Sequence, residues 1–308
     1  MTATTPTVRE LVLGIEARFR AAGLHYGHGT DNPRDEAVWL VFHLLGLPYD
    51  CPEAALEEPV PAAARERIEA LAAERIASRR PLAYLLGEAW FAGLPFRVDE
   101  RVLIPRSPFA ELIREGFAPW LEPASIRRVL EIGTGSGCMA VATAHYLPQA
   151  EVVATDIDEG ALALAEENAR RHGVAGRVRL ARADVYEGLD EPPFDLIISN
   201  PPYVPQASME TLPPEYRHEP AAALAAGTQG LDVVDRLLAG ASRFLRPGGT
   251  LIVEVGEAQP FVEANYPRLP LTWLEFAHGG EGVFLIGREA LAGAALHLPQ
   301  GPSMIGTV

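Results

Sequence analysis

The stretch VLEIGTGSGCMAVA, residues 129–142, contains an apolar run, three closely spaced glycines and a second apolar run. This pattern predicts a buried strand, a loop whose glycines let the backbone approach a ligand, and a helix whose first N–H groups are free to bind that ligand. A GxGxG turn occurs in nucleotide-binding proteins of several classes, so the turn alone does not identify the ligand. It does predict a βα unit of an α/β domain.

Strands and helices alternate along the rest of the chain from residue 127. Strands are expected at 127–132, 151–156, 177–182, 193–199, 249–255, 271–276 and 282–287, and helices at 137–147, 159–172, 230–245 and 258–265. Apolar strands that alternate with helices predict a mainly parallel, Rossmann-like sheet of seven strands with helices on both faces. The last two strands are separated only by the segment around HGGEG (278–282), so we expect a hairpin there and one antiparallel strand.

The first 80 residues have a helical period instead. Helices are expected at 7–22, 33–46 and 62–79, and Asn32-Pro33 is typical of a helix start. The segment FAGLPFRVDERVLI (91–104) is typical of short strands around turns. The predicted organisation is a helical domain at 1–81, a β-hairpin connector at 82–106, a Rossmann-like domain at 107–290 and a tail at 291–308, which is rich in Ala, Gly and Pro and is expected to be poorly ordered.

Composition and charge limit the classes of function. The formal net charge is −15, with 41 acidic against 26 basic residues, which argues against a large surface for binding phosphates. A basic protein partner suits this charge better, although acidity that only maintains solubility is an alternative. No apolar run is long enough to span a membrane, and the N-terminus does not resemble a secretion signal. We therefore expect a cytoplasmic protein in which Cys51 and Cys138 are reduced.

Acidic residues beside the glycine loop favour a cationic cofactor. Glu131 precedes the loop, and Asp156 ends the second strand, where a carboxylate can accept hydrogen bonds from both hydroxyls of a ribose. The spacing differs from the GxGxxG of dinucleotide sites, and Glu131 would repel a pyrophosphate, so S-adenosylmethionine fits better than NAD. Asp184 could accept from an adenine amino group; the alternative for each acid is a solvated strand end. The loop residues expected to contact the cofactor are Gly133, Thr134, Gly135, Ser136 and Gly137.

The segment SNPPYVP (199–205) follows the fourth strand and is rigid because two prolines are consecutive. The side-chain oxygen of Asn200 and the carbonyl oxygen of Pro201 can accept the two hydrogens of a planar NH₂ group, and Tyr203 can cover the flat face of that group. Such an arrangement aims the nitrogen at an electrophilic carbon. A plain diproline loop would explain the prolines but not the flanking Asn and Tyr, so we predict a catalytic site.

At this point the chain resembles a known family. The motif NPPY is similar to that of amino-methyltransferases acting on adenine, cytosine or protein glutamine. The segments RRPLAYLLGEAWFAGLPFRVDERVLIPRS (79–107), EIGTGSG (131–137) and ISNPPYV (198–204) closely resemble the HemK/PrmC family of protein N5-glutamine methyltransferases. HYGHGTDNPRDEAVWLV (25–41), VLIPRSPFAELI (102–113) and LPPEYRHEPAAALAAGTQGLD (212–232) resemble its PrmB branch, which methylates ribosomal protein L-three. The release-factor branch usually carries Arg-Pro-Glu-Thr-Glu where this chain has Arg106, Ser107 and Pro108.

The resemblance implies a class I S-adenosylmethionine-dependent methyltransferase fold and site residues to match. It assigns the glycine loop, Asp156 and Asn200 to the cofactor, and Asn200, Pro201, Pro202 and Tyr203 to the glutamine. The family often has an aromatic residue where this chain has Val185, so Tyr186 is a candidate for stacking on the adenine instead. Arg106 is expected either to contact the substrate backbone or to pair with an acid.

Other interpretations remain open. A release-factor methyltransferase differs only in its substrate. A DNA or RNA amino-methyltransferase is disfavoured by the acidic chain, and a noncatalytic module by the intact loop, Asp156 and Asn200. The spacing of His25, His28 and Asp31 is compatible with a metal site, but no cysteine is nearby, and we favour a surface for the substrate or a helix-capping loop without a metal. The loop 216–220 is expected to border the acceptor cleft.

Overall fold

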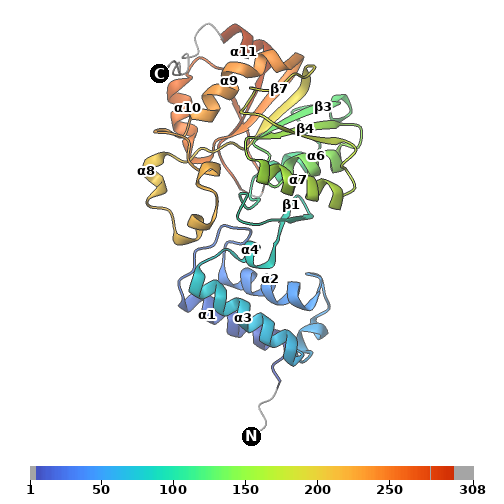
Figure 1. The fold of residues 1–308 in the computed structure, drawn as a ribbon, viewed down its shortest axis with the longest axis vertical. Coiled ribbons are helices and arrows are strands. Elements are labelled where there is room, and N and C mark those ends of the chain that lie inside the picture. The colour runs from blue at the N-terminus through green and yellow to red at the C-terminus, as the bar shows by residue number, and fades with distance from the viewer. Residues whose placement is uncertain (1–4, 278, 295–308) are drawn as a thin grey trace.

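A computed structural model describes residues 5–277 and 279–294 of the chain. Helices α1 to α3 form one end of the molecule, the α/β unit forms the other, and the hairpin that begins with β1 lies between them (Figure 1). Among the described residues, none of the helices combines the length and apolar character needed to cross a lipid bilayer.

Helices α1 and α2 begin at residues whose side chains cap them. Thr7 and Glu10 form a reciprocal capping box at the start of α1, and the Asn32 side chain accepts from the Asp35 N–H at 2.9 Å at the start of α2. Gly46 ends α2 in the left-handed conformation. The bounds are Val8–Ala21 for α1, Pro33–Leu45 for α2, Ala62–Ser78 for α3 and Leu82–Leu86 for α4.

The connector contains the expected hairpin and one unexpected helix. Strands β1 (Glu88–Phe91) and β2 (Leu94–Arg97) pair antiparallel around a turn at Ala92-Gly93, where both residues have positive φ. Helix α4 precedes them because Leu82, Ala83 and Tyr84 pack into the core of the helical region. Asn168 of α7 then ties the hairpin to the glycine loop: it accepts from the Arg97 N–H at 2.8 Å and donates to the Ser136 carbonyl at 2.8 Å.

The sheet has seven strands in the order β5-β4-β3-β6-β7-β9-β8. The first five in this order are parallel, and β9 is antiparallel to both neighbours, which confirms the prediction of a mainly parallel sheet that ends in a hairpin. The last hairpin is shorter than expected because β8 has only two residues. The bounds are Arg128–Ile132 for β3, Glu151–Asp156 for β4, Val178–Arg182 for β5, Phe194–Ser199 for β6, Leu245–Glu254 for β7, Thr272–Trp273 for β8 and Val283–Gly287 for β9.

Helices cover both faces of this sheet and bury two apolar cores. One core contains side chains of α5, α6 and the hairpin, and the other contains side chains of α9, α10 and α11. The bounds are Phe109–Arg114 for α5, Cys138–Tyr146 for α6, Glu159–Arg171 for α7, Gln206–Met209 for α8, Asp232–Phe244 for α9, Gln259–Asn265 for α10 and Arg288–Ala294 for α11. Helix α11 corrects the expectation of a poorly ordered tail from residue 291, because Leu291 is buried in the second core. Residues 295–308 of that tail lie outside the described residues.

The strand order places the candidate site at one edge of the sheet. The chain runs outward from β3 through β4 to β5 and then returns to the other side of β3 as β6, so β3 and β6 flank the switch point where ligands of such sheets bind. Ile132 and Ser199 are in register on these strands. Gly133 and Asn200, which follow them, therefore leave the sheet side by side.

Candidate active site

The glycine loop leaves β3 and presents open space next to its backbone. Gly133, Gly135 and Gly137 all have positive φ. A Cβ on Gly133 or Gly135 would meet nothing within 4 Å, whereas one on Gly137 would lie 2.9 Å from the Ala165 Cβ. The first two glycines therefore leave room for a ligand, and the third lets α6 pack closely against α7.

Glu131 at the end of β3 is suited to a cationic ligand. Its side chain is 1% exposed and accepts a hydrogen bond from the Thr134 hydroxyl at 2.7 Å. Burial raises the pKa of this carboxyl to about 8, so a positive charge beside it would stabilise the ionised form. The buried hydroxyl oxygen of Ser136, in the same loop, has no hydrogen-bond partner among the described residues. Both groups fit a polar, cationic ligand such as S-adenosylmethionine.

Asp156 at the end of β4 faces the loop. One oxygen accepts from the Gly135 N–H at 2.9 Å and the other from the Asp158 N–H at 3.0 Å, and burial raises its pKa. Each oxygen keeps a further lone pair that can accept from a ribose hydroxyl. The next residue, Ile157, is 57% exposed, and its apolar side chain was missed in the sequence analysis although it stands in the turn DID (156–158).

The residues after β5 differ in part from expectation. The Asp184 carboxylate pairs with Arg236 at 2.7 Å, and Val185 is buried with a positive φ. The Tyr186 ring stacks on Phe244, with ring centres 4.8 Å apart, and its hydroxyl donates to a carbonyl of α9. The suggestion that Tyr186 stacks on an adenine is therefore wrong, because the core beneath α9 already holds this ring. Roles for Asp184 and Val185 stay predictions.

Asn200, Pro201 and Tyr203 line a cavity of about 230 Å³ at the end of β6. The Tyr203 hydroxyl donates to Glu254 at 3.1 Å, and a Cβ on Gly256 would lie 2.7 Å from the Tyr203 ring. The ring is thus held between a carboxylate and a close backbone. The cavity is the place where the sequence analysis put the planar NH₂ group.

Glu254 at the end of β7 is a site residue that the sequence analysis missed. It is 5% exposed and accepts hydrogen bonds from the hydroxyls of both Tyr203 and Ser107. Burial raises its pKa to about 7. The signal in the sequence was an acid inside the apolar strand LIVEV (251–255).

Arg106 also lines this cavity, but its charge is paired. Its guanidinium donates to both oxygens of Glu219, at 2.6 and 2.9 Å. Of the two roles expected for Arg106, the structure therefore has the pairing with an acid. Glu219 also accepts from the Ile104 N–H at 3.0 Å, and the His28 ring nitrogen lies 3.3 Å away. Burial alone would raise the pKa of Glu219, but His28 and Arg106 together lower it to about 2.

Comparison with known proteins identifies the family. Two family models match, the PrmC N-terminal domain over residues 15–87 and the methyltransferase small domain over residues 116–213. A ribosomal protein uL3 glutamine methyltransferase from Neisseria meningitidis serogroup B is 44% identical over 93% of this chain and 95% of its own length. One from Bordetella pertussis is 44% identical over 92% of this chain and 96% of its own. The chain belongs to the ribosomal protein uL3 glutamine methyltransferase family.

Membership of this family confirms the resemblance found in the sequence and the class of enzyme, a glutamine methyltransferase. The strand order and the methyltransferase-domain match confirm the class I fold. A solved methyltransferase from Pyrococcus furiosus aligns with a TM-score of 0.46 and 21% identity over 74% of this chain and 99% of that one.

In the present chain, the loop over the cavity that contains Asn200 is anchored on the N-terminal helices. Arg75 of α3 is 1% exposed, and its guanidinium lies 2.7 Å from Glu36 and 3.4 Å from Glu215. Glu215 also accepts from the His25 N–H at 2.9 Å. Glu215 belongs to the short helix at Pro214–His218, so a buried ion cluster fixes this part of the loop.

The loop 25–31 packs against the anchored segment. The rings of His25 and His28 lie 5.5 and 4.6 Å from the Tyr216 ring, which lines the cavity. Asp31 instead accepts a hydrogen bond from Asn32. In the part of the chain that the structure describes, no group of three or more His, Cys, Asp or Glu side chains could hold a metal ion.

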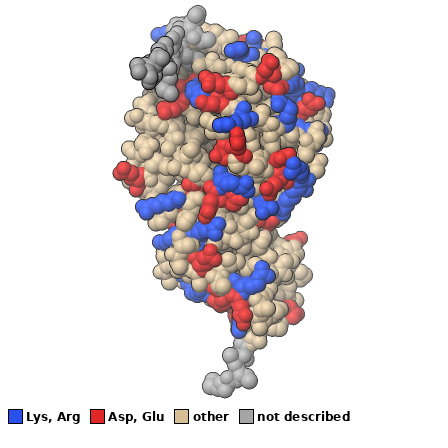
Figure 2. All heavy atoms as spheres, viewed as in Figure 1, with Lys and Arg blue, Asp and Glu red and all other residues tan. Residues whose placement is uncertain are grey.

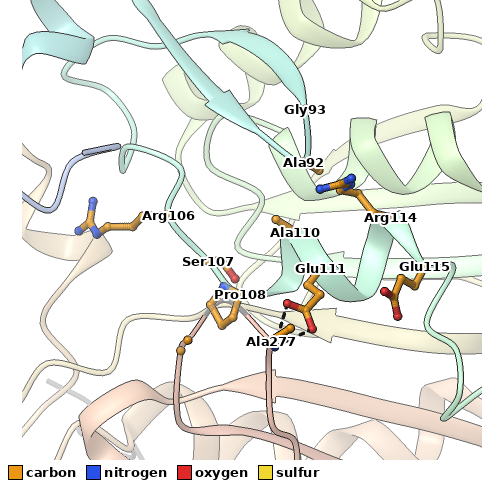
Figure 3. A pocket seen from close by; sticks show the side chains of 12 residues that line it. Ala92, Gly93, Arg106, Ser107, Pro108, Ala110, Glu111, Arg114, Glu115 and Ala277 are labelled. Carbon is orange, nitrogen blue, oxygen red and sulfur yellow. Dashed lines mark hydrogen bonds between the residues drawn. The ribbon is translucent and has the colours of Figure 1, made fainter. Parts of the chain in front are cut away.

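A larger hollow of about 660 Å³ lies on the other side of Ser107 and Pro108. Figure 3 shows that Arg106 points away from α5, whereas Glu111 points from α5 toward Ala277. The Glu111 carboxylate accepts a hydrogen bond from the Ala277 N–H at 3.0 Å. Small residues line much of the remaining wall: Ala92, Gly93, Ala110, Gly279 and Gly280. Arg106 lines both this hollow and the smaller cavity.

Proposed function

We propose that this chain transfers a methyl group from S-adenosylmethionine to the side-chain nitrogen of one glutamine in ribosomal protein uL3. The observation that carries the proposal is that Asn200, Pro201 and Tyr203 line one cavity, and that Asn200 leaves β6 next to the end of β3, from which the glycine loop begins. The substrate follows the names of relatives that are 44% identical over nearly their whole length. Because ribosomal proteins are made in the cytoplasm, we place the reaction there.

The cofactor supplies an electrophilic methyl group bound to a positively charged sulfur. Glu131 provides a buried carboxyl beside that charge, and Asp156 accepts from the ribose hydroxyls. The exposed side chain of Ile157 offers an apolar surface to the adenine. Burying this side chain against a ring would contribute about 1 kcal/mol or more, since fully burying an isoleucine contributes about 1.5–3 kcal/mol.

The acceptor amide is held by the end of β6. Asn200 Oδ1 and the Pro201 carbonyl accept its two N–H groups, and the Tyr203 ring covers one face. The nitrogen then presents its other face toward the glycine loop. A strong base would not be needed, since binding both N–H groups raises the electron density on nitrogen and stabilises the charge that develops there. The N–C bond would form as the C–S bond breaks, the cofactor would leave as a neutral thioether, and the methylated nitrogen would lose one proton to water.

Replacing Asp156 with alanine should weaken cofactor binding by about 1.5–3 kcal/mol, the range for hydrogen bonds to a charged group. Isothermal titration with S-adenosylmethionine measures the change. Glu159→Ala is a matched control, because it removes an exposed acid three residues away whose ion-pair partner, among the described residues, is the exposed Arg182. Equal affinities for wild type and Asp156→Ala would remove Asp156 from the cofactor site.

The dependence of kcat/KM on pH should follow Glu254. Above its raised pKa of about 7 the carboxylate accepts from both Tyr203 and Ser107, whereas the protonated form carries a hydrogen that competes for one of these positions. We therefore expect kcat/KM to rise between about pH 6 and 8 and this rise to be lost in Glu254→Gln. The effect on stability has the opposite sign: with the folded pKa above the ordinary 4.5, stability falls as pH rises through about 7. An unaltered pH profile in Glu254→Gln would assign the titration to another group.

Incubation of the purified enzyme with radiolabelled cofactor and candidate substrates tests the proposal. The panel contains ribosomal protein uL3, a release factor, and DNA and RNA oligonucleotides, and mass spectrometry locates the methyl group. We expect one methylated glutamine in uL3, with an association rate that falls as salt rises. Over the described residues visible in Figure 2, acidic and basic side chains are interleaved rather than gathered into a basic patch, which disfavours nucleic acid as the substrate on this face. Methylation of the release factor alone would move the chain to the other branch.

A further inference from the structure

A third cavity, of about 340 Å³, lies where the N-terminal helices meet the hairpin. It is lined by Gly29, Thr30, Asp35, Trp39, Tyr49 and Trp90. None of these residues lines the cavity that contains Asn200. Three aromatic rings and one carboxylate therefore surround a hollow to which the methyl-transfer chemistry assigns no role.

Two of the three rings are exposed to solvent. Trp90 of β1 is 48% exposed and Tyr49 is 60% exposed, so these large aromatic surfaces remain in water in the free protein. Trp39 is only 5% exposed, and its indole nitrogen has no hydrogen-bond partner among the described residues. Exposed aromatic groups around a hollow indicate a binding surface.

Gly29 brings the backbone of the pocket close to the Trp39 ring. Gly29 has a φ of 104°, and a Cβ there would lie 3.4 Å from the Trp39 ring. Asp35 is in the first turn of α2, where the Asn32 side chain donates to its carboxylate at 2.8 Å and its own N–H donates to Asn32. The carboxylate is therefore held in place and solvent-exposed.

We propose that this pocket binds the side chain of an arginine or lysine of the substrate protein at a distance from the methylated glutamine. Aromatic faces attract a cation through their π electrons, and a nearby carboxylate adds a charge interaction. The formal net charge of −15 suits a basic polypeptide on this surface. The inference rests on the proposed function, because it names a second contact of the same protein substrate.

The position of the pocket in the sequence supports this assignment. Gly29, Thr30, Asp35 and Trp39 all belong to 25–41, the segment that resembles the PrmB branch. The same segment contains His25 and His28, which pack on Tyr216 at the acceptor cavity. The segment 25–41 thus lines the pocket and also packs against Tyr216 at the acceptor cavity. It therefore fixes the distance between the two places where the substrate would bind.

Kinetics with two substrates test the proposal. One is full-length uL3, and the other is a short peptide around its methylated glutamine that is too short to reach the pocket. Trp90→Ala and Tyr49→Ala should each raise KM for the full-length protein by about tenfold, within the range for a cation over an aromatic ring, and leave kcat unchanged. KM for the peptide should not change. Asp35→Asn should raise KM for the protein and weaken its dependence on salt.

Trp120→Ala is the matched control, because Trp120 is 43% exposed but does not line the pocket. Circular dichroism and the thermal midpoint verify folding, and Tyr49→Ala and Trp90→Ala test the pocket independently if one of them misfolds. A KM for uL3 that stays at the wild-type value in the pocket variants would overturn the inference and leave the proposed function standing. An equal rise in KM for uL3 with Trp120→Ala, or an equal rise in KM for the peptide with the pocket variants, would also overturn the inference. A wild-type enzyme that methylates neither substrate would instead refute the proposed function, and the inference with it.

Discussion

Replacing Asn200 with alanine should lower kcat by at least about a hundredfold and leave the fold intact. Loss of one positioned hydrogen-bonding group at a reacting centre commonly costs about 10²–10³ in rate. Asn200 is partly exposed at the cavity and lies after β6 rather than within it, so its removal leaves no strand residue unpaired. Single-turnover transfer of a radiolabelled methyl group to uL3 measures the loss directly.

Two further variants separate orientation of the amide from mere occupancy of the cavity. Asn200→Asp keeps an oxygen that accepts from N–H, so it should retain part of the activity that alanine loses. Tyr203→Phe keeps the ring but removes the hydrogen bond to Glu254, and it should have a smaller effect than Asn200→Ala. Near wild-type turnover in Asn200→Ala would mean that another group holds the acceptor nitrogen.

Local signals in the sequence were sufficient for most of the fold. The glycine loop, the cap at Asn32 and the alternation of apolar strands with helices depend on neighbouring residues, and each is found as predicted. Helix α4 and helix α11 were missed because packing against distant residues stabilises them. In α11, for example, Leu291 fills a core that strands and helices far earlier in the chain create.

The residues of the candidate site likewise fall into those that a local motif reveals and those that depend on distant partners. Asn200 and the glycine loop stand in short motifs whose residue types suit a definite chemistry, so the sequence alone could propose roles for them. Glu254 and Glu219 act through partners 147 and 113 residues away, Ser107 and Arg106, and no local pattern reveals such pairs. Tyr186 was misassigned for the same reason, since its ring is held by Phe244 from a different helix.

Replacing Arg75 with methionine should destabilise the protein by about 3–5 kcal/mol, the range for removing one partner of a buried ion pair. Methionine keeps much of the side-chain volume, but Glu36, which is 4% exposed, would lose its cation, and Glu215, which is 0% exposed, would keep only Arg79 at 3.4 Å. Denaturant unfolding monitored by circular dichroism measures the free energy. Arg67→Met is the control on the same helix, because Arg67 is exposed and should change stability by no more than about 0.5 kcal/mol.

The charge explanation can be separated from a packing explanation by neutralising the two acids as well. If the loss of the Arg75 charge causes the destabilisation, Glu36→Gln in the Arg75→Met background should restore most of the lost stability, because Glu36 then carries no buried charge, and Glu215→Gln should add less, because Glu215 still pairs with Arg79. The rescue should be incomplete, because the Arg75 guanidinium also donates to the His25 carbonyl at 3.0 Å. No rescue at all would show that the lost hydrogen bond to the His25 carbonyl, rather than the charge of the two acids, accounts for the destabilisation.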